Sequence, residues 1–426
     1  MEWIGLISGP LLVAAAMVVV SRFYDLMRVD DPFVYSFAFI SIFWIAGMGL
    51  APYIPGALEI ETPTKLLLAV GYVSFVAGGV IGTRLPRGSE WSRRYDRIQP
   101  QRGLSSLELG LLGGTLIVGL LSILLLVALV GGIPVLMPDA EQARVDERAG
   151  LGYLFISAIW LMALPTVALV SHARIRGSGS WILAATLVAV VATVAMAVIG
   201  NRGPPIIMLI GAAFVAVVAC GALPRWRTLV LIGGAALVVL AVTVVLRTGE
   251  DLTLAAVWNR IEWQMYVNPS NFQRLVDFIP EQVGYLLGYG YLIDLAVLLP
   301  GPQINFSTWL KEAMGLEFAG GGITISLLGE LYANWGPVIA VIAPAVVAIG
   351  LSMVRGVLSV RTPLDGAFVI LLSLSLGGIM QSGIVSPLLY SVLPLTGLYV
   401  VLRVAGGQLA ARPWLAPQAR SVGRDS

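Results

Sequence analysis

The sequence predicts an all-α integral membrane protein that crosses the bilayer many times. Of its 426 residues, 58% are hydrophobic and only 12% are charged, about half of the ~25% charged share of ordinary soluble domains. The mean hydropathy is +0.89, and apolar runs long enough to cross ~30 Å of hydrocarbon recur along the chain. These observations exclude a soluble enzyme, a secreted disulfide scaffold and a disordered protein.

The chain carries few signals of processing or of cofactor binding. Its single cysteine, Cys220, cannot form a disulfide within the chain. Residues 3–22 lack the basic leading region and the cleavage pattern of a removable signal peptide, so we expect Met1 to stay in the mature protein. The sequence contains no P-loop, GxGxxG fingerprint or CxxC pair, so nothing in it indicates a nucleotide, a metal or another cofactor.

Apolar stretches of about 17 to 25 residues predict eleven transmembrane helices. Four precede any sizeable outer loop, at residues 3–21, 33–52, 64–83 and 107–130. Four more follow, at residues 152–171, 181–199, 204–221 and 228–246. The last three lie at residues 337–354, 364–382 and 387–402. We therefore divide the chain into a bundle of eight helices, one long outer segment, three C-terminal helices and a tail, at residues 1–246, 247–336, 337–403 and 404–426.

The distribution of basic residues predicts the orientation of these helices. One side of the membrane would hold 18 of the 26 Lys and Arg residues, and the other side would hold 8 basic residues against 16 carboxylates. Cytoplasmic loops keep the excess of positive charge, so we expect the N-terminus outside and the C-terminus in the cytoplasm. The basic run at 84–102 is interpreted as a topology anchor that faces anionic membrane lipid, in preference to a specific headgroup or partner site. The net charge of +2 gives no reason to expect nucleic-acid binding.

Polar residues break the hydrophobic pattern first in the outer loop at 131–150. A Gly-Gly-Ile-Pro turn leads to Asp139, which can cap a short helix. Arg144 and Arg148, four residues apart, would share one face of that helix and are candidate substrate contacts. For this loop by itself, the favoured interpretation is a solvated surface helix whose arginines pair with nearby carboxylates.

The connection GNRGPP at 200–205 places Arg202 at the outer edge of the membrane. Its flanking glycines allow a ligand to approach the backbone, and Pro204 suits the first turn of a helix whose free N–H groups favour anions. This pattern indicates an arginine that faces a phosphate. The alternative is an arginine that extends to lipid headgroups, which runs against the positive-inside bias.

The long outer segment is too long for a simple connector and too apolar for disorder. Residues 252–266 have the pattern of an amphipathic helix on the membrane surface, and we expect the sequence NPS at 268–270 to form a turn and start a new helix at Ser270. Arg260 and Arg274 are either substrate contacts or ordinary surface charges. Residues 283–300, which include three glycines, three tyrosines and Asp294, predict a re-entrant or interfacial segment.

A polar stripe is predicted just before the ninth span. Three glycines precede a helix there, and Gly336-Pro337 should end or kink it. Ser326, Glu330 and Asn334 fall at i, i+4 and i+8, so they would share one helix face with a carboxylate at its centre. Polar contacts between helices are the alternative, but a carboxylate is a costly residue for that purpose, which favours a functional site.

Arginines and a carboxylate on the outer face suit transfer from a lipid-linked phosphate donor. Arginine binds phosphate oxygens with its planar fork and keeps its charge, so it can stabilise a departing pyrophosphate. A partly buried Glu can act as general base toward an acceptor hydroxyl. The one histidine, His172, is expected in a loop on the inner side, where it could not assist chemistry on the outer face.

Three motifs resemble the oligosaccharide repeat-unit polymerases, the O-antigen (Wzy-type) polymerases of bacterial envelopes. They are the GGIP turn with D-A-x-x-A-R at 132–144, the N-R-G turn at 201–203, and GGGxxxSxxGExYxNxG at 320–336. The resemblance implies a fold similar to the GT-C membrane glycosyltransferases. It also implies a metal-independent enzyme of the bacterial inner (plasma) membrane, with a flippase and a chain-length regulator as functional neighbours.

The resemblance further implies the reaction and the roles of individual residues. The enzyme would transfer a growing glycan from undecaprenyl pyrophosphate to a new lipid-linked repeat unit at the outer face. Arg202 and Arg144 would stabilise the pyrophosphate, and Glu330 would be the base or would position the acceptor. Tyr332 and Asn334 would support the site, and Arg260 and Arg274 are weaker candidates from the long outer segment. Arg148 lies outside the matching motifs and is a substrate-binding candidate from its spacing alone.

Two alternatives remain open at the level of the sequence. An O-antigen ligase would move finished glycan from the same carrier to a lipid A core, but ligases look to an outer-face histidine, which is absent here. A transporter of lipid-linked glycan would be expected to carry inverted repeats and polar groups at the membrane midplane. The charges here cluster at one face of the membrane, which favours a transferase.

Overall fold

The computed structural model describes residues 36–37, 58–84, 103–137, 151–200, 203–220, 234, 253–299, 304–318, 322–354 and 360–406. Within these ranges every regular element is a helix, and seven helices are long and apolar enough to cross a membrane. The prediction of an all-α protein that crosses the membrane many times is therefore confirmed. Three of the eleven predicted spans, at 3–21, 33–52 and 228–246, fall almost wholly outside the described residues.

The other eight predicted spans are helical in the structure. The first five are α4 (Thr62–Arg84), α6 (Ser106–Val130), α8 (Gly152–Arg176), α9 (Gly179–Val198) and α10 (Gly203–Cys220). After the long outer segment come α16 (Pro337–Val354) and α17 (Pro363–Gly377), which continues as α18 (Ile379–Ser382). The last span combines α19 (Val385–Pro387), the π-helical turn η5 (Leu388–Val392) and α20 (Leu393–Ala405).

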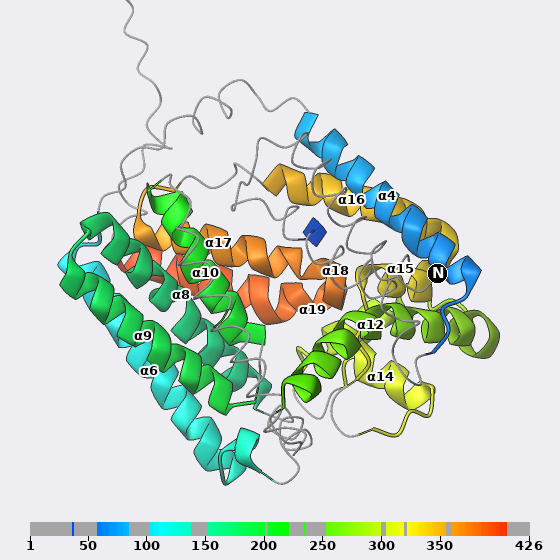
Figure 1. Cartoon of the computed structure of the whole chain (residues 1–426), viewed down its shortest axis with the longest axis horizontal. Coiled ribbons are helices and arrows are strands. Elements are labelled where there is room, and N and C mark those ends of the chain that lie inside the picture. Colours follow the sequence, from blue (N-terminus) through cyan, green and yellow to red (C-terminus); the bar gives the residue numbers. More distant parts are fainter. Residues whose placement is uncertain are drawn as a thin grey trace, which may run out of the picture.

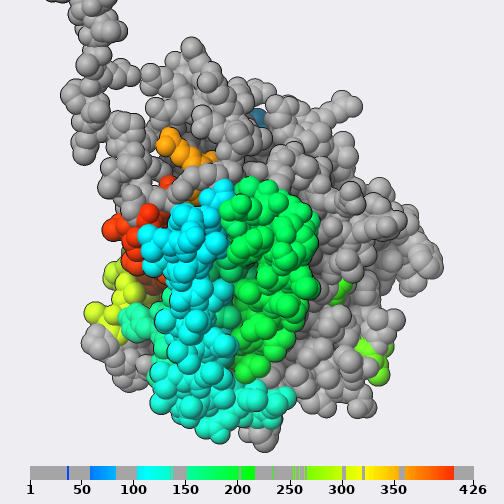
Figure 2. Space-filling view, turned by 90° about the vertical axis from the view of Figure 1, so that its left-hand side faces the viewer, coloured from blue at the N-terminus to red at the C-terminus, as the bar shows by residue number. Residues whose placement is uncertain are grey.

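The helices pack in two groups around a buried centre (Figure 1). α4 lies along α16, while α8 packs against α6, α9, α10 and α17. Every residue of α17 is buried, as expected for a helix surrounded by others. α6 and α9 share one face of the molecule (Figure 2), where exposed apolar side chains such as Leu121, Leu124, Leu187 and Val190 form the surface expected to face lipid.

Buried polar contacts join the helix ends on one side of the bundle. α6 and α17 each start with a capping box, built by Ser105 with Glu108 and by Thr362 with Asp365. The Asp365 carboxylate also accepts from the Tyr399 hydroxyl at 2.7 Å and forms an ion pair of 3.1 Å with Arg403, and both charged groups are buried. Since each charge has its partner, these contacts fix the ends of α17 and α20 against each other.

The expectation that His172 is a loop residue is wrong. His172 is buried in the last turns of α8, where its Nδ1 accepts the backbone N–H of Leu104 at 2.9 Å and its ring packs edge-on against Trp181 at 5.0 Å. α8 continues beyond its apolar run to Arg176, because these contacts of His172 stabilise the last turns of the helix. His172 still lies at the end of the bundle where α6 starts.

Close contact of α4 with α16 depends on glycine. A Cβ atom at Gly78 would overlap the backbone of Ala345, whereas a Cβ at Gly114 on α6 would meet no atom within 4 Å. We expect Gly78→Ala to lower the free energy of unfolding by about 1–3 kcal/mol through overpacking, and Gly114→Ala to have little effect. Thermal melting of both variants in the same detergent measures this, and equal melting temperatures would contradict the packing described.

The described part of the outer segment contains four α-helices and a π-helical turn, and one prediction for it is wrong. α12 (Leu254–Phe278) runs straight through the sequence NPS, so the predicted turn and new helix start at Ser270 are wrong. The helix continues because the residues after Pro269 are held by packing, with Phe272 and Leu275 buried, and such packing overrides a local preference for a turn. The π-helical turn η4 (Ile279–Val283) follows, and then α13 (Tyr289–Ala296), α14 (Phe306–Ala313) and α15 (Leu327–Trp335).

Candidate active site

The predicted polar stripe lies on a short buried helix. α15 starts at the N-cap Ser326, whose hydroxyl accepts the Gly329 N–H at 3.1 Å. Gly336, with φ of +80°, ends α15, and α16 starts at Pro337, as the sequence predicts. Ser326, Glu330 and Asn334 are all buried, so each needs a polar partner inside the protein.

Asn334 joins α15 to α13. Its amide nitrogen donates to the Glu330 carbonyl at 2.8 Å, and its amide oxygen accepts the Gly290 N–H at 3.0 Å. The backbone carbonyl of Asn334 accepts the Leu287 N–H at 2.8 Å. The side chain is therefore used for holding two helices together.

Tyr332 belongs to an aromatic cluster beside the same helix. Its ring packs edge-on against Phe272 of α12 and against Tyr285, with ring centres 5.8 Å apart in both pairs. Burial raises the pKa of Tyr332 above its usual value, so its hydroxyl stays protonated. The cluster fixes the position of α15 from the side of α12.

Glu330 is the one residue of the stripe with an unused oxygen. Its Oε2 accepts the backbone N–H of Ile384, in the turn between α18 and α19. Its Oε1 is buried and has no hydrogen-bond partner among the described residues. Burial raises the pKa of the Glu330 carboxyl to about 8, because it disfavours the charged form; the Ile384 N–H opposes this effect and the negative charge of Asp294 adds to it.

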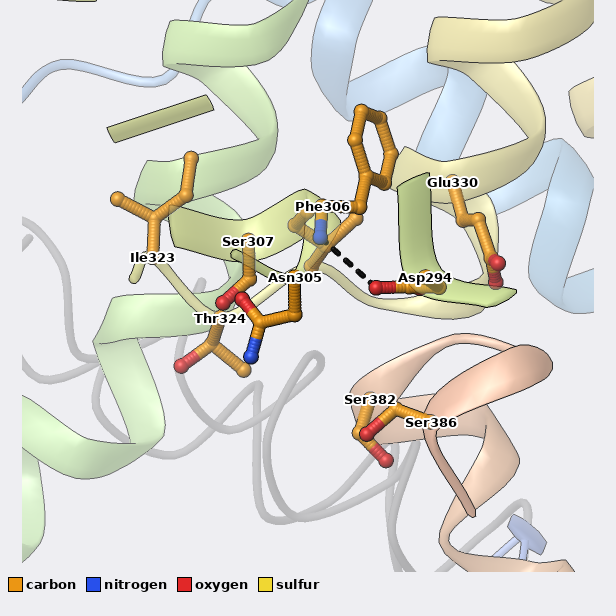
Figure 3. Close-up of a pocket in the computed structure, with 10 residues that line it drawn as sticks. Asp294, Asn305, Phe306, Ser307, Ile323, Thr324, Glu330, Ser382 and Ser386 are labelled. Atoms are coloured by element: carbon orange, nitrogen blue, oxygen red, sulfur yellow. Dashed lines mark hydrogen bonds between the residues drawn. The ribbon is translucent and has the colours of Figure 1, made fainter. Parts of the chain in front are cut away.

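The Glu330 side chain lines a cavity of about 100 Å³ between the outer-segment helices and the α18–α19 turn (Figure 3). Asp294 of α13 lies on the same wall, and its Oδ1 accepts the Phe306 N–H at 2.8 Å. Burial raises the pKa of Asp294 as well. The remaining wall combines polar and apolar side chains: Asn305, Phe306, Ser307, Ile323, Thr324, Ile325, Ser382 and Ser386. Two carboxylates from different helices thus converge on one small polar space.

Asp294 is not among the site residues predicted from the sequence. A single carboxylate in the otherwise apolar run 283–300 was a signal of function, because such residues are costly near a membrane. Asp294 and Glu330 are 36 positions apart in the chain, so no local sequence pattern links them. They lie close together because α13 contacts α15.

The structure brings together only part of the predicted site. Glu330, Tyr332 and Asn334 lie together on α15, while Arg274 lies on α12, is half-buried, and is not among the described residues that line the cavity. The predicted residues Arg144, Arg148 and Arg202 lie outside the described ranges, as does the side chain of Arg260 on α12. In the described part of the chain, no group of three or more His, Cys, Asp and Glu residues is placed to hold a metal ion.

The sequence was compared with known protein families. The sequence matches the family described as "Putative O-antigen polymerase" over residues 32–390, which is most of the chain. Neither the curated proteins nor the solved structures returned a match. The matched region includes α15 and every described residue that lines the cavity.

Proposed function

Since the chain belongs to the O-antigen polymerase family, we propose that it joins lipid-linked repeat units by moving a growing glycan from undecaprenyl pyrophosphate to a new unit. The family supports polymerisation of repeat units, on a lipid-linked glycan in a membrane, as the general activity. The donor, the outer face of the bacterial plasma membrane and the residue roles below are our proposal. The observation that carries it is Glu330, a buried carboxylate with a free oxygen that lines a polar cavity.

In this reaction Glu330 is the general base. A hydroxyl oxygen of the acceptor sugar forms a bond to the anomeric carbon of the donor glycan, and the bond from that carbon to the pyrophosphate oxygen breaks. The hydroxyl proton goes to Oε1 of Glu330, and the bonding electrons leave with the pyrophosphate. A pKa of about 8 makes Glu330 a better base than an exposed carboxylate, because catalytic efficiency is highest when the pKa lies near the working pH.

Arginines would stabilise the negative charge that builds up on the leaving group. We assign this role to Arg202 and Arg144, which lie in the motifs that resemble the family. Arg148, Arg260 and Arg274 lie outside those motifs and are proposed as further substrate contacts only from their places in the outer segments. A guanidinium suits pyrophosphate because it stays charged and binds two oxygens at once. No metal ion takes part in the mechanism that we propose.

The position of the cavity along the bundle supports the outer face as the place of reaction. Asp365, paired with Arg403, lies near the start of the span Pro363–Ser382, and Ser382 at its other end lines the cavity. A helix of 20 residues is about 30 Å long, which is the thickness of the hydrocarbon. Arg361 binds Asp365 through its backbone N–H, and Arg174 and Arg176 lie in the last turn of α8, which meets the start of α6 as the end of α20 does. Positive charge favours the cytoplasm, which would leave the cavity outside.

A reconstituted reaction tests this proposal. Purified protein in lipid vesicles is given the undecaprenyl-pyrophosphate-linked repeat unit of the native strain, and the products are separated on a gel. We expect a ladder of glycans that differ by one repeat unit. Transfer that occurs only after lipid A core is added would instead indicate a ligase, and movement of the lipid-linked glycan across the membrane without new glycosidic bonds would indicate a transporter.

The rate of polymer formation should depend on pH through Glu330. The base must be deprotonated, and its pKa of about 8 leaves only a small fraction in that form at pH 6. We therefore expect the initial rate to rise roughly 50-fold from pH 6 to pH 8 and to level off above pH 9. Initial rates at saturating pyrophosphate-linked donor over this range measure it, and a rate that is flat or falling between pH 6 and pH 8 would contradict Glu330 as the base.

A further inference from the structure

Asp294 is a buried carboxylate that the proposed reaction does not use. Among the described residues one hydrogen-bond donor meets it, the Phe306 N–H at Oδ1. A carboxylate can accept about four hydrogen bonds, so Asp294 has capacity left on the side of the cavity. Glu330 adds the buried and unpartnered Oε1 to the same space.

The rest of the cavity wall offers both hydrogen-bond donors and hydrogen-bond acceptors. The Asn305 oxygen accepts the Thr308 N–H at 2.8 Å, which leaves the amide nitrogen of Asn305 as a donor. The Ser382 hydroxyl donates to the Gly378 carbonyl at 2.9 Å and can still accept. A cavity of about 100 Å³ is also several times the roughly 10–15 Å³ needed to hold one water molecule.

We propose that this cavity binds the acceptor sugar through its hydroxyl groups and that Asp294 and Glu330 together select a sugar that carries no negative charge. The proposal rests on the proposed function, because it names the acceptor of that reaction. Sugar hydroxyls both donate and accept, so they match two carboxylates, an amide donor and several hydroxyls. Hydrogen bonds to a carboxylate are stronger than those to neutral groups.

The charge of the wall provides the selectivity. None of the described residues that line the cavity is cationic, and two of them carry carboxyl groups. A uronic acid or a phosphate in this space would find no cationic partner, and it would be repelled by whichever of the two carboxyls is ionised, Glu330 most of all above pH 8. A neutral or amino sugar would meet only hydrogen-bond partners. The pyrophosphate of the donor would for the same reason bind outside the cavity, near the arginines.

Direct binding measurements test the proposal without turnover. The repeat unit of the native strain is cut from its lipid by mild acid, and part of it is treated so that its primary hydroxyls are oxidised to carboxylates. Binding of both glycans to the purified protein is followed by saturation-transfer NMR. We expect the wild type to bind the untreated glycan at least tenfold more tightly than the oxidised one.

Variants locate the effect. Asp294→Asn keeps an oxygen for the Phe306 N–H but removes the charge, so it should weaken binding of the untreated glycan about tenfold and reduce the preference over the oxidised glycan. Glu312→Gln removes an exposed charge on α14 and should bind both glycans as the wild type does. Melting temperatures check that both variants are folded.

Three results would overturn the inference: no binding of the untreated glycan by the wild type, equal binding of the two glycans, or unchanged binding by Asp294→Asn. An accepting sugar that is itself acidic in the native glycan would also overturn it. The ladder assay is read separately. A ladder without charge selectivity would contradict only this inference, whereas selective sugar binding without a ladder would contradict the polymerase and leave the sugar site in place.

Discussion

Glu330→Gln is expected to slow polymer formation by about 10²–10⁴-fold, the contribution typical of a general base. The substitution keeps an oxygen that can accept the Ile384 N–H, so the turn between α18 and α19 should stay in place. What it removes is the ability to take the acceptor proton. The rate of ladder formation at pH 8, compared with the wild type in the same vesicles, measures the effect.

Two further variants separate chemistry from structure. Glu312→Gln makes the same change at an exposed carboxylate on α14 and should polymerise at the wild-type rate. Glu330→Ala also removes the acceptor of the Ile384 N–H, so it should lose stability as well as activity. If Glu330→Gln keeps full activity while Glu330→Ala does not, Glu330 only positions the turn and is not the base.

The stability of Glu330→Gln should differ from that of the wild type in a pH-dependent way. Folding raises the pKa of Glu330 from 4.5 to about 8, so its contribution to stability is present at low pH and is lost as pH rises from about 4.5 through 8. A glutamine at position 330 stays neutral, so its contribution to stability does not change with pH. The melting temperature of Glu330→Gln should therefore exceed that of the wild type increasingly between pH 6 and pH 9, and a constant difference would contradict a buried, destabilised carboxylate.

Local patterns in the sequence predicted much of the fold. The described spans follow from apolar runs, and α15 follows from polar residues spaced by four, because a helix repeats every 3.6 residues. Gly336 and Pro337 predicted the boundary between α15 and α16, again from local preferences. Glycine tolerates the positive φ that ends α15, and proline suits the first position of α16. The predictions agree with the structure where neighbouring residues alone determine the local conformation.

The errors and omissions share a long-range origin. The NPS sequence in α12 and the residues from His172 onward in α8 have local patterns that favour a helix end, but contacts with distant residues keep both helices intact. The site shows the same limit. Glu330 was found from its place in the stripe, but its contact with Ile384, 54 residues away, and the cavity shared with Asp294 could not be predicted without the packing of helices.

Gly383→Ala is the second substitution with a large expected effect. Gly383 lies in the turn between α18 and α19 with φ of +79°, a conformation that is strained for any residue with a Cβ. A Cβ atom there would also overlap Oε2 of Glu330, so alanine would push the carboxylate away from both Ile384 and the cavity. We expect polymer formation to fall at least a hundredfold and the free energy of unfolding to fall by about 1–3 kcal/mol.

The pairing of Gly383 with Glu330 makes this prediction specific. Gly397→Ala on α20, where a Cβ meets no atom within 4 Å, should leave both activity and melting temperature unchanged. In a Glu330→Ala background the overlap no longer exists, so adding Gly383→Ala should lower the melting temperature less than it does in the wild type. Equal effects in the two backgrounds would show that only backbone strain at Gly383 matters. The turn would then not be what holds Glu330 at the cavity, and the position of the proposed base would need another cause.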